Sequence, residues 1–317
     1  MINLVRLIKE EKKIYYYTVY GLNIKSDIEI NEFLVCENRY YDINFIIGNM
    51  PEEIIKLSKD GARSYYSKNK IWFHIDNIAS YYVENGDTVI VEPCENADMT
   101  LIKIYLMCSC LGFIMIQREN LAIHGGTVAL NSNGIIITGD RGAGKSTLTS
   151  ALRLKGYKFI SDDVAAIKIN EIASINPGFP YQKLCEDAME NLGYDKSKYS
   201  SFSSDDEIKY MVPSHKDFIN YRIPLKAIFE LVAGDIGKVE IEEIIGGEKL
   251  SKIIKNIYRI EYIDRMGGIT PKVFKQCIEI AKYTKFYKIT RPRDGFTVND
   301  QIELIEEVLN SNNEKVV

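Results

Sequence analysis

No run of basic residues stands out along this 317-residue chain, and its formal net charge is −4. Proteins that bind nucleic acid normally carry a basic stripe or patch, so the sequence gives such a function little support. The N-terminal segment, MINLVRLIKEEKK, lacks the apolar run and the small-residue cleavage site of a secretory signal. We therefore expect a cytoplasmic protein that does not bind nucleic acid.

The cysteines also lack the spacing of a metal site. All of them are far apart except one pair, and no Cys/His grouping has the spacing of zinc ligands. We expect free thiols in a reducing compartment. The six cysteines are Cys36, Cys94, Cys108, Cys110, Cys185 and Cys277.

One segment, residues 101–117 (LIKIYLMCSCLGFIMIQ), is apolar enough to be compared with a membrane span. It is short for comfortable spanning, carries Lys103, and is flanked by ordinary soluble sequence. The pattern favours a helix buried between two domains, with no membrane partner.

Residues 1–96 have a β-rich pattern. Residues 14–22 are aromatic and β-branched, and residues 70–76 and 79–84 alternate. Asn85-Gly86-Asp87 is a hairpin signal that turns the chain into residues 88–92. We predict a small accessory domain over 1–96 that is structural or holds a substrate or partner.

From residue 97 onward, strands alternate with helices, which is typical of an α/β domain. We predict one such domain over 97–317, with a polar loop at residues 200–206 (SSFSSDD). The expected strands are 122–130, 135–138, 159–161, 164–169, 227–232 and 286–290, and the expected helices are 146–154, 182–192, 246–259, 271–282 and 298–309.

A phosphate-binding motif lies between the second of these strands and the first helix. The sequence G-x-x-x-x-G-K-[ST] is matched in full by Gly139, Asp140, Arg141, Gly142, Ala143, Gly144, Lys145 and Ser146. Glycines let successive backbone N–H groups point at phosphate oxygens, and the helix N-terminus adds partial positive charge. Lys145 can bridge the β- and γ-phosphates and Ser146 can ligate Mg²⁺, with Thr147 next in the helix. ATP and Mg²⁺ are the expected cofactors.

Two acids, Asp162 and Asp163, follow a short strand directly. A phosphoryl-transfer site needs a carboxylate for the metal and often a second one that takes the acceptor's proton. Neighbouring side chains at a strand end point to opposite sides, so the pair can serve both needs. The alternative is a solvated turn or a helix N-cap. His124, in the strand before the loop strand, is a third candidate, with a satisfied core histidine as its alternative.

Together, His124, the loop fifteen residues later and the acid pair resemble the catalytic core of HPr kinase/phosphorylase. The resemblance covers residues 121–169 and implies the fold that this family shares with phosphoenolpyruvate carboxykinase. It implies that these groups line one site, with Asp162 as proton acceptor and Asp163 as metal ligand, although the two roles could be exchanged. The expected fold is thus an α/β, carboxykinase/HPr-kinase-like P-loop kinase domain with a smaller β-rich N-terminal domain.

Outside this core the chain departs from the bifunctional enzyme. The N-terminal region looks different and the phosphorylase signature is not recognisable, so we do not expect phosphorolysis. The segments YGLNIKSDIEI, LAIHGGTV and NPGFPYQKL are closer to the HPr-kinase-like proteins of bacterial peptide-modification clusters. Those include kinases that phosphorylate a C-terminal serine of lasso-peptide precursors.

Two further residues fit the wider pattern. Lys183 could reach an anionic group of the substrate, or be a surface lysine on a first helical turn. Arg259, expected late in a helix, could stabilise charge on the γ-phosphoryl oxygens, or pair with the helix C-terminus.

The sequence therefore predicts an ATP-dependent serine kinase acting on a hydroxyl of a peptide or small protein. One alternative is a kinase of a free small molecule, such as an amino acid or sugar. The other is a non-catalytic nucleotide-binding module. The presence of two carboxylates argues against it, because binding alone needs at most one metal ligand. A homo-oligomer remains open.

Overall fold

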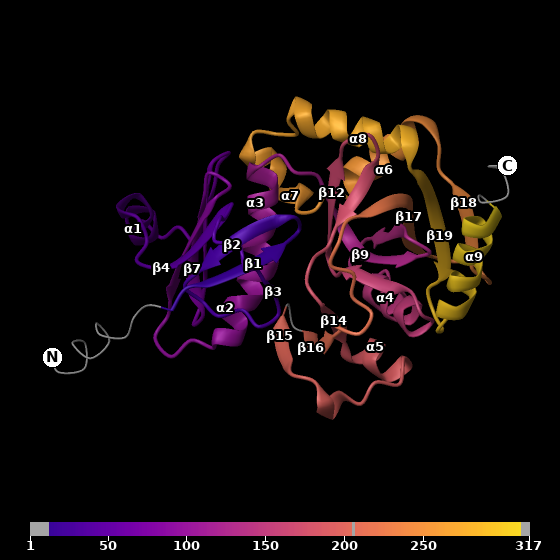
Figure 1. Cartoon of the computed structure of the whole chain (residues 1–317), viewed down its shortest axis with the longest axis horizontal. Coiled ribbons are helices and arrows are strands. Elements are labelled where there is room, and N and C mark those ends of the chain that lie inside the picture. Colours follow the sequence, from indigo (N-terminus) through magenta and orange to yellow (C-terminus); the bar gives the residue numbers. More distant parts are fainter. Residues whose placement is uncertain (1–12, 205–206, 312–317) are drawn as a thin grey trace.

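The computed structural model describes residues 13–204 and 207–311, and its N-terminal part is one mixed eight-stranded sheet (Figure 1). The predicted strand at 14–22 is divided by a turn at Tyr20 and Gly21, whereas the hairpin at Asn85-Gly86 is confirmed. In spatial order the strands are β3 (Leu34–Val35), β1 (Tyr15–Val19), β2 (Leu22–Ser26), β4 (Ile43–Ile47), β8 (Thr88–Pro93), β7 (Ala79–Glu84), β6 (Lys70–Ile75) and β5 (Ser64–Tyr66).

A short helix covers one face of this sheet and a long one covers the other. Helix α1 (Glu52–Lys59) packs its Ile54 against Trp72 and Tyr82. The long helix runs over Met99–Gln117 as α2 (Met99–Tyr105), a π-helical turn η1 (Leu106–Cys110) and α3 (Leu111–Gln117).

The long helix is apolar and long enough to cross a membrane, but more than half of it is buried inside the protein. Ile102, Leu106 and Phe113 pack in one core with strands of the first sheet. The same core includes Val164 and Tyr258 from the C-terminal part of the chain. The prediction of a helix buried between two parts of the protein is confirmed.

The second sheet carries the phosphate-binding motif. Its twelve-residue strand β17 pairs with β13 through its first residues and runs parallel to β10 along the rest, so the sheet bends back on itself. Its members are β10 (Asn133–Gly139), β9 (Ala122–Leu130), β12 (Val164–Ile169), β13 (Ala173–Asn176), β17 (Ile223–Gly234), β19 (Lys285–Pro292) and β18 (Glu240–Glu243), with β11 (Lys158–Ser161) beside β9.

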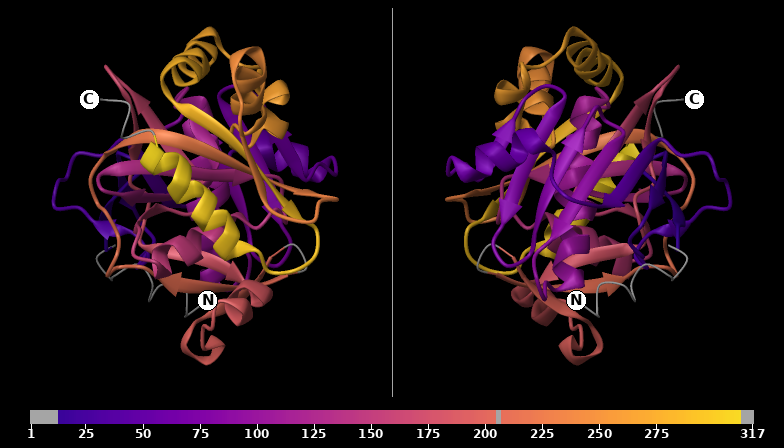
Figure 2. Two further views of the ribbon diagram at one scale, coloured as in Figure 1. Left: turned by 90° about the vertical axis from the view of Figure 1, so that its right-hand side faces the viewer. Right: turned by 90° about the vertical axis from the view of Figure 1, so that its left-hand side faces the viewer.

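Helices cover both faces of this second sheet. Helices α4 (Lys145–Leu154) and α9 (Val298–Ser311) pack on one face, and Figure 2 shows α9 crossing it from the outside. Helices α6 (Gly246–Lys255) and α8 (Pro271–Tyr283) pack on the other, joined by α7 (Ile260–Ile263) and the 3₁₀ turn η3 (Asp264–Met266). This part of the molecule is mixed α/β, and the motif lies between a strand and a helix as predicted.

A small third sheet corrects the helix predicted at 182–192. Its order is β14 (Tyr181–Cys185), β16 (Glu207–Pro213) and β15 (Ser201–Ser204). Only Glu186–Asn191 is helical (α5), followed by the 3₁₀ turn η2 (Lys196–Lys198), because alternate side chains of β14 are buried against the protein and its backbone pairs with β16. The predicted loop at 200–206 is partly β15, and residues 205–206 lie outside the described part of the chain.

The helix predicted over 246–259 ends at Lys255. The Asn256 side chain donates back to the Lys252 carbonyl, which caps the helix. The next residues then pair with β9, because Tyr258 N–H donates to the Ala122 carbonyl and Asn256 accepts from His124 N–H. Arg259 therefore precedes α7 in the left-handed conformation, with φ 61°, and does not lie late in a helix.

Candidate active site

The phosphate-binding loop curls tightly between β10 and α4. Gly139, Gly142 and Gly144 have positive φ angles of 137°, 79° and 103°. A Cβ at Gly139 would lie 2.4 Å from the Leu231 carbonyl oxygen of neighbouring strand β17, so only glycine fits there. The backbone N–H groups at the start of α4 have no partners within the helix, which favours a bound anion.

Lys145 folds back over the loop that carries it. Its Nζ donates to the carbonyls of Gly139 at 3.0 Å and Asp140 at 3.1 Å. The two carbonyls accept hydrogen bonds that phosphate oxygens would accept from the Lys145 ammonium group in a nucleotide complex. The cradle and the lysine thus suit a nucleotide phosphate, as the motif predicts.

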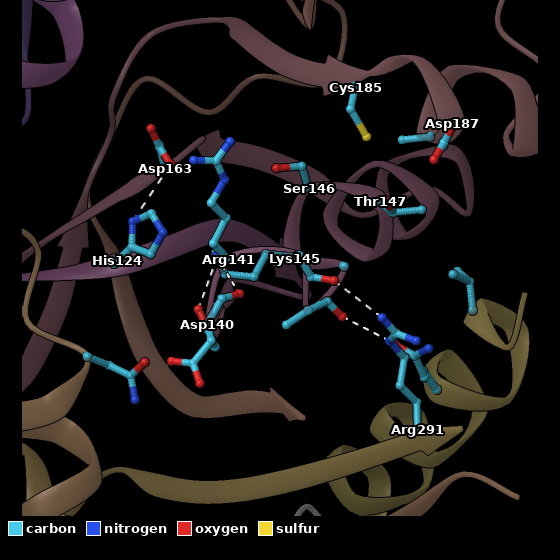
Figure 3. Close-up of a pocket in the computed structure, with 18 of the residues that line it drawn as sticks. His124, Asp140, Arg141, Lys145, Ser146, Thr147, Asp163, Cys185, Asp187 and Arg291 are labelled. Atoms are coloured by element: carbon cyan, nitrogen blue, oxygen red, sulfur yellow. Dashed lines mark hydrogen bonds and ion pairs between the residues drawn. The ribbon is translucent and has the colours of Figure 1, made fainter. Parts of the chain in front are cut away.

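Arg291, which the sequence did not single out, holds the loop from the end of β19. Its Nε donates to the Ala143 carbonyl at 3.0 Å and its Nη2 to the Gly142 carbonyl at 3.3 Å (Figure 3). A second support comes from Gln182, whose Nε2 donates to the Ser146 carbonyl at 3.0 Å. Both residues are distant in sequence from the loop, so only the fold could identify them.

The two predicted acids have different surroundings. Asp162 is 5% exposed, and its Oδ2 accepts from the Lys183 backbone N–H at 2.9 Å. Burial raises the pKa of Asp162 above its usual range, and the charge of Lys183 offsets this only in part. Asp163 borders the cavity described below, whereas Asp162 does not.

Asp163 has a positive φ of 64°, unusual for a residue other than glycine and a type of strain common at functional sites. Its Oδ2 accepts from Lys183 Nζ at 2.7 Å. Burial by itself would raise the pKa of Asp163, but the charge and hydrogen bond of Lys183 outweigh it and hold that pKa well below the usual range. The surroundings of Asp163 therefore favour its anionic form.

Lys183 is a half-buried strand residue of β14, with a side chain that is 15% exposed, and not the surface lysine of a helix. Besides Asp163, its Nζ contacts Cys108 Sγ at 3.1 Å. Burial would lower the pKa of Lys183, yet Asp163 raises it well above its usual value. Lys183 thus supports the acid, and it does not itself border the cavity.

His124 faces Asp163 from β9, with Nδ1 3.7 Å from Asp163 Oδ1 (Figure 3). Burial lowers the pKa of His124 below its usual range, and Asp163 opposes this only in part. The ring is therefore uncharged near neutral pH and able to accept a proton.

Arg259 reaches the same region from the start of α7. Its Nη2 donates to Ser109 Oγ at 2.9 Å, and its guanidinium lies 5.5 Å from the centre of the Tyr258 ring. This places a permanent positive charge at the cavity wall.

A buried polar network lies behind the loop strand. Thr138 Oγ1 contacts the His124 carbonyl and Asn256 Oδ1, and Asn256 Nδ2 donates to Glu230 at 3.1 Å. Lys252 pairs with Glu230 at 2.8 Å. This network was not predicted, and its one signal in the sequence is the acid Glu230 inside the apolar strand predicted at 227–232.

One cavity of about 780 Å³ joins these groups. Figure 3 shows His124 and Asp163 on one side of the loop, Arg291 on the other, and Cys185 and Asp187 above Ser146 and Thr147. The cavity is bordered by every residue predicted to bind nucleotide, and by His124, Asp163 and Arg259; it does not include Asp162 or Lys183 among its lining residues.

Ser146 and Asp163, the residues predicted to bind Mg²⁺, both border this cavity and could offer the ion oxygen ligands. Among the described residues, no group of three His, Cys, Asp or Glu could hold a metal alone. One hydroxyl and one carboxylate suit Mg²⁺, which is commonly bound through one or two protein groups, water and substrate phosphates.

No known family model matches the chain, and no curated protein matches it. Among solved structures, the Hpr(Ser) kinase/phosphatase from Coxiella burnetii is similar, with a TM-score of 0.32 and 14% identity over 61% of this chain and 97% of that one. So slight a likeness does not support an activity for this chain.

Proposed function

We propose that this protein is an ATP-dependent phosphotransferase that passes the γ-phosphoryl group to a hydroxyl. The observation that carries the proposal is that Lys145, His124 and Asp163 border one cavity at the phosphate-binding loop. A base, a carboxylate held in its anionic form and a phosphate cradle are the groups that phosphoryl transfer uses.

The loop would bind the phosphates through its backbone N–H groups and Lys145. For Lys145 to act on the β- and γ-phosphates, its Nζ exchanges the Gly139 and Asp140 carbonyls for phosphate oxygens. Arg291 keeps the loop curled through the carbonyls of Gly142 and Ala143. Ser146 and Asp163 would hold Mg²⁺, which neutralises charge on the phosphoryl oxygens.

His124 is the group we assign to the acceptor's proton. It borders the cavity and is uncharged near neutral pH, whereas Asp162 is buried outside the cavity lining and accepts a backbone hydrogen bond. With Nδ1 turned toward Asp163, Nε2 is the nitrogen left to accept a proton. The anionic Asp163 then stabilises the charged ring that forms. Arg259 offers its charge to the transferred group.

The acceptor we propose is a serine of a peptide or small protein, such as one at a flexible end of a ribosomal peptide precursor. Support comes from the order of segments along the chain and from the cavity, whose lining includes exposed Glu207 and Glu261. A flexible peptide end can enter beside these residues, and its ordering offsets part of the contact energy.

The first test is Lys145→Ala. We expect the variant to fold and to lose transfer by roughly a thousandfold, because a charge contact to the transferring group is removed. Lys155→Ala is the matched control, since Lys155 is exposed, directly follows the same helix and pairs with Glu306 at 2.8 Å. Near-normal turnover of Lys145→Ala would mean that the loop is not the catalytic phosphate site.

The acceptor is tested by incubating the protein and Mg·ATP with precursor peptides, free serine and folded HPr. Phosphorylation adds about 80 daltons, the mass of one phosphoryl group, which mass spectrometry detects. We expect modification of peptides. Modification of free serine or HPr with every peptide untouched would overturn the acceptor and leave the phosphotransferase proposal standing.

A further inference from the structure

The long apolar helix changes character where it passes the candidate active site. Within Met99–Gln117, the turn Leu106–Cys110 is π-helical. Such turns are rare, insert an extra residue into the helix and occur frequently at functional sites. None of the residues in this turn belongs to the phosphate-binding loop or to the acid pair.

Two neighbouring residues of the π turn contact three residues of the site. Ser109 Oγ accepts from Arg259 Nη2 at 2.9 Å. Cys108 Sγ contacts Lys183 Nζ at 3.1 Å, and its carbonyl accepts from Tyr258 Oη–H at 3.3 Å. The helix thus reaches both the arginine at the cavity wall and the lysine that holds Asp163.

Arg259 needs such an anchor. Its backbone is left-handed, and the exposed carboxylate of Glu261 stays 3.9 Å from Nη1. The rings of Tyr258 and Tyr262, 5.5 and 5.8 Å from the guanidinium, attract the charge but fix its direction less sharply than a hydrogen bond does. The buried hydroxyl of Ser109 supplies that direction.

Close packing holds the helix at this place. A Cβ at Gly112 would lie 2.3 Å from Tyr258 Cε1, so the helix can approach the Tyr258 ring only because this residue is glycine. Tyr258 directly precedes Arg259 and is itself fixed to β9 through the Ala122 carbonyl. The π turn and Arg259 are therefore held at a constant separation.

We propose that Ser109 is a positioning residue of the transfer reaction: it orients the Arg259 guanidinium toward the transferred phosphoryl group. This inference rests on the proposed function. It makes the helix outside the phosphate-binding region a part of the active site.

The test is a double-mutant cycle on transfer kinetics. Ser109→Ala should lower kcat by about tenfold to a hundredfold, the size expected for a hydrogen bond to a charged group, with the Mg·ATP dissociation constant unchanged within about twofold. Ser109→Thr keeps the hydroxyl and should restore most of kcat. In an Arg259→Gln background, Ser109→Ala should have no further effect. Thr100→Ala, at an exposed residue of the same helix, is the control.

A second measurement does not depend on turnover. In NMR spectra, the side-chain N–H signals of Arg259 can be assigned by their loss in Arg259→Gln. They should shift or broaden in Ser109→Ala and return to their wild-type positions in Ser109→Thr. Unchanged Arg259 signals, or a kcat loss that persists in the Arg259→Gln background, would overturn the inference. A wild-type protein that transfers phosphate to no acceptor would instead overturn the proposed function, while the Arg259 signals still decide whether Ser109 orients this side chain.

Discussion

His124 and Asp162 are the two candidates for accepting the proton of the acceptor hydroxyl, and their surroundings favour His124. We predict that His124→Gln lowers transfer by about a hundredfold or more, the usual contribution of a general base, while Mg·ATP affinity stays within a few fold. Asp162→Asn should retain most of the activity, because its side chain does not border the cavity. Single-turnover transfer and nucleotide titration measure the two effects. The opposite outcome would restore Asp162 as the proton acceptor predicted from the sequence.

Asp162 should also show its burial in the pH dependence of stability. Its folded-state pKa is raised, so the folded protein keeps the proton to a higher pH than the unfolded chain does. The free energy of unfolding therefore falls as pH rises from the unfolded pKa, about 4, through the folded one. Asp162→Asn removes this loss and can still accept from the Lys183 backbone N–H.

We accordingly expect Asp162→Asn to gain stability over the wild type as pH increases from 5 to 8, by on the order of 1–2 kcal/mol. Urea unfolding at both pH values measures it. Asp60→Asn, at an exposed position, is the matched control. A variant that becomes relatively less stable toward pH 8 would mean that the charge of Asp162 is favourable where it lies.

Residues with local signals could be predicted, and those placed by the fold could not. The loop and the position of Lys145 follow from one motif. The resemblance implied that His124 and both acids line its cavity, and of these His124 and Asp163 border it whereas Asp162 does not. Arg291 is more than a hundred residues from the loop in sequence. It reaches the loop only because β19 pairs in parallel with β17, and β17 pairs with β10, the strand that leads into the loop. Nothing in the sequence around Lys183 indicates that this residue forms an ion pair with Asp163.

At the scale of elements, the same division holds. Hairpin 79–92 and helices α8 and α9 have strong local patterns and are close to their predicted bounds. The segment 182–192 combines a strand and a helix. The local pattern of its first residues does not reveal that they pair with β16, a strand that comes some twenty residues later. Helix α6 ends earlier than predicted because the residues that follow it pair with β9, a strand more than a hundred residues away in the sequence.

Two glycine substitutions test how elements meet. Gly112→Ala should destabilise the protein by about 1–3 kcal/mol, because the new methyl group overlaps the Tyr258 ring. Gly247→Ala in α6 has no atom within 4 Å of the new Cβ and should stabilise by about 0.5–1 kcal/mol. Urea unfolding of both variants gives the comparison. If Gly112→Ala proves neutral, helix α3 is free to move away from Tyr258, and the fixed separation of Ser109 and Arg259 is wrong.

At the scale of the whole molecule, the boundary predicted between 1–96 and 97–317 crosses a shared core. Tyr17, Ile24 and Phe45 of the first sheet pack in one cluster with helix residues such as Ile102 and with Val164 and Tyr258 beyond it. Full burial of a large apolar side chain contributes about 1.5–3 kcal/mol, and separation would remove the part of it that comes from contacts across the boundary.

We therefore predict that residues 97–317 expressed alone will not fold to a stable monomer, because the face of the long helix that packs on the first sheet would meet water. The expected signs are aggregation, binding of a hydrophobic dye and no cooperative thermal transition. Expressing 1–96 and 97–317 together as two chains is the control, since the break falls in the exposed stretch at Glu95 and Asn96, between β8 and α2. The two chains should associate and recover Mg·ATP binding. A soluble 97–317 that unfolds cooperatively and binds Mg·ATP by itself would show that the catalytic part is an independent domain, and that the first sheet is an accessory to it in the way the sequence predicts.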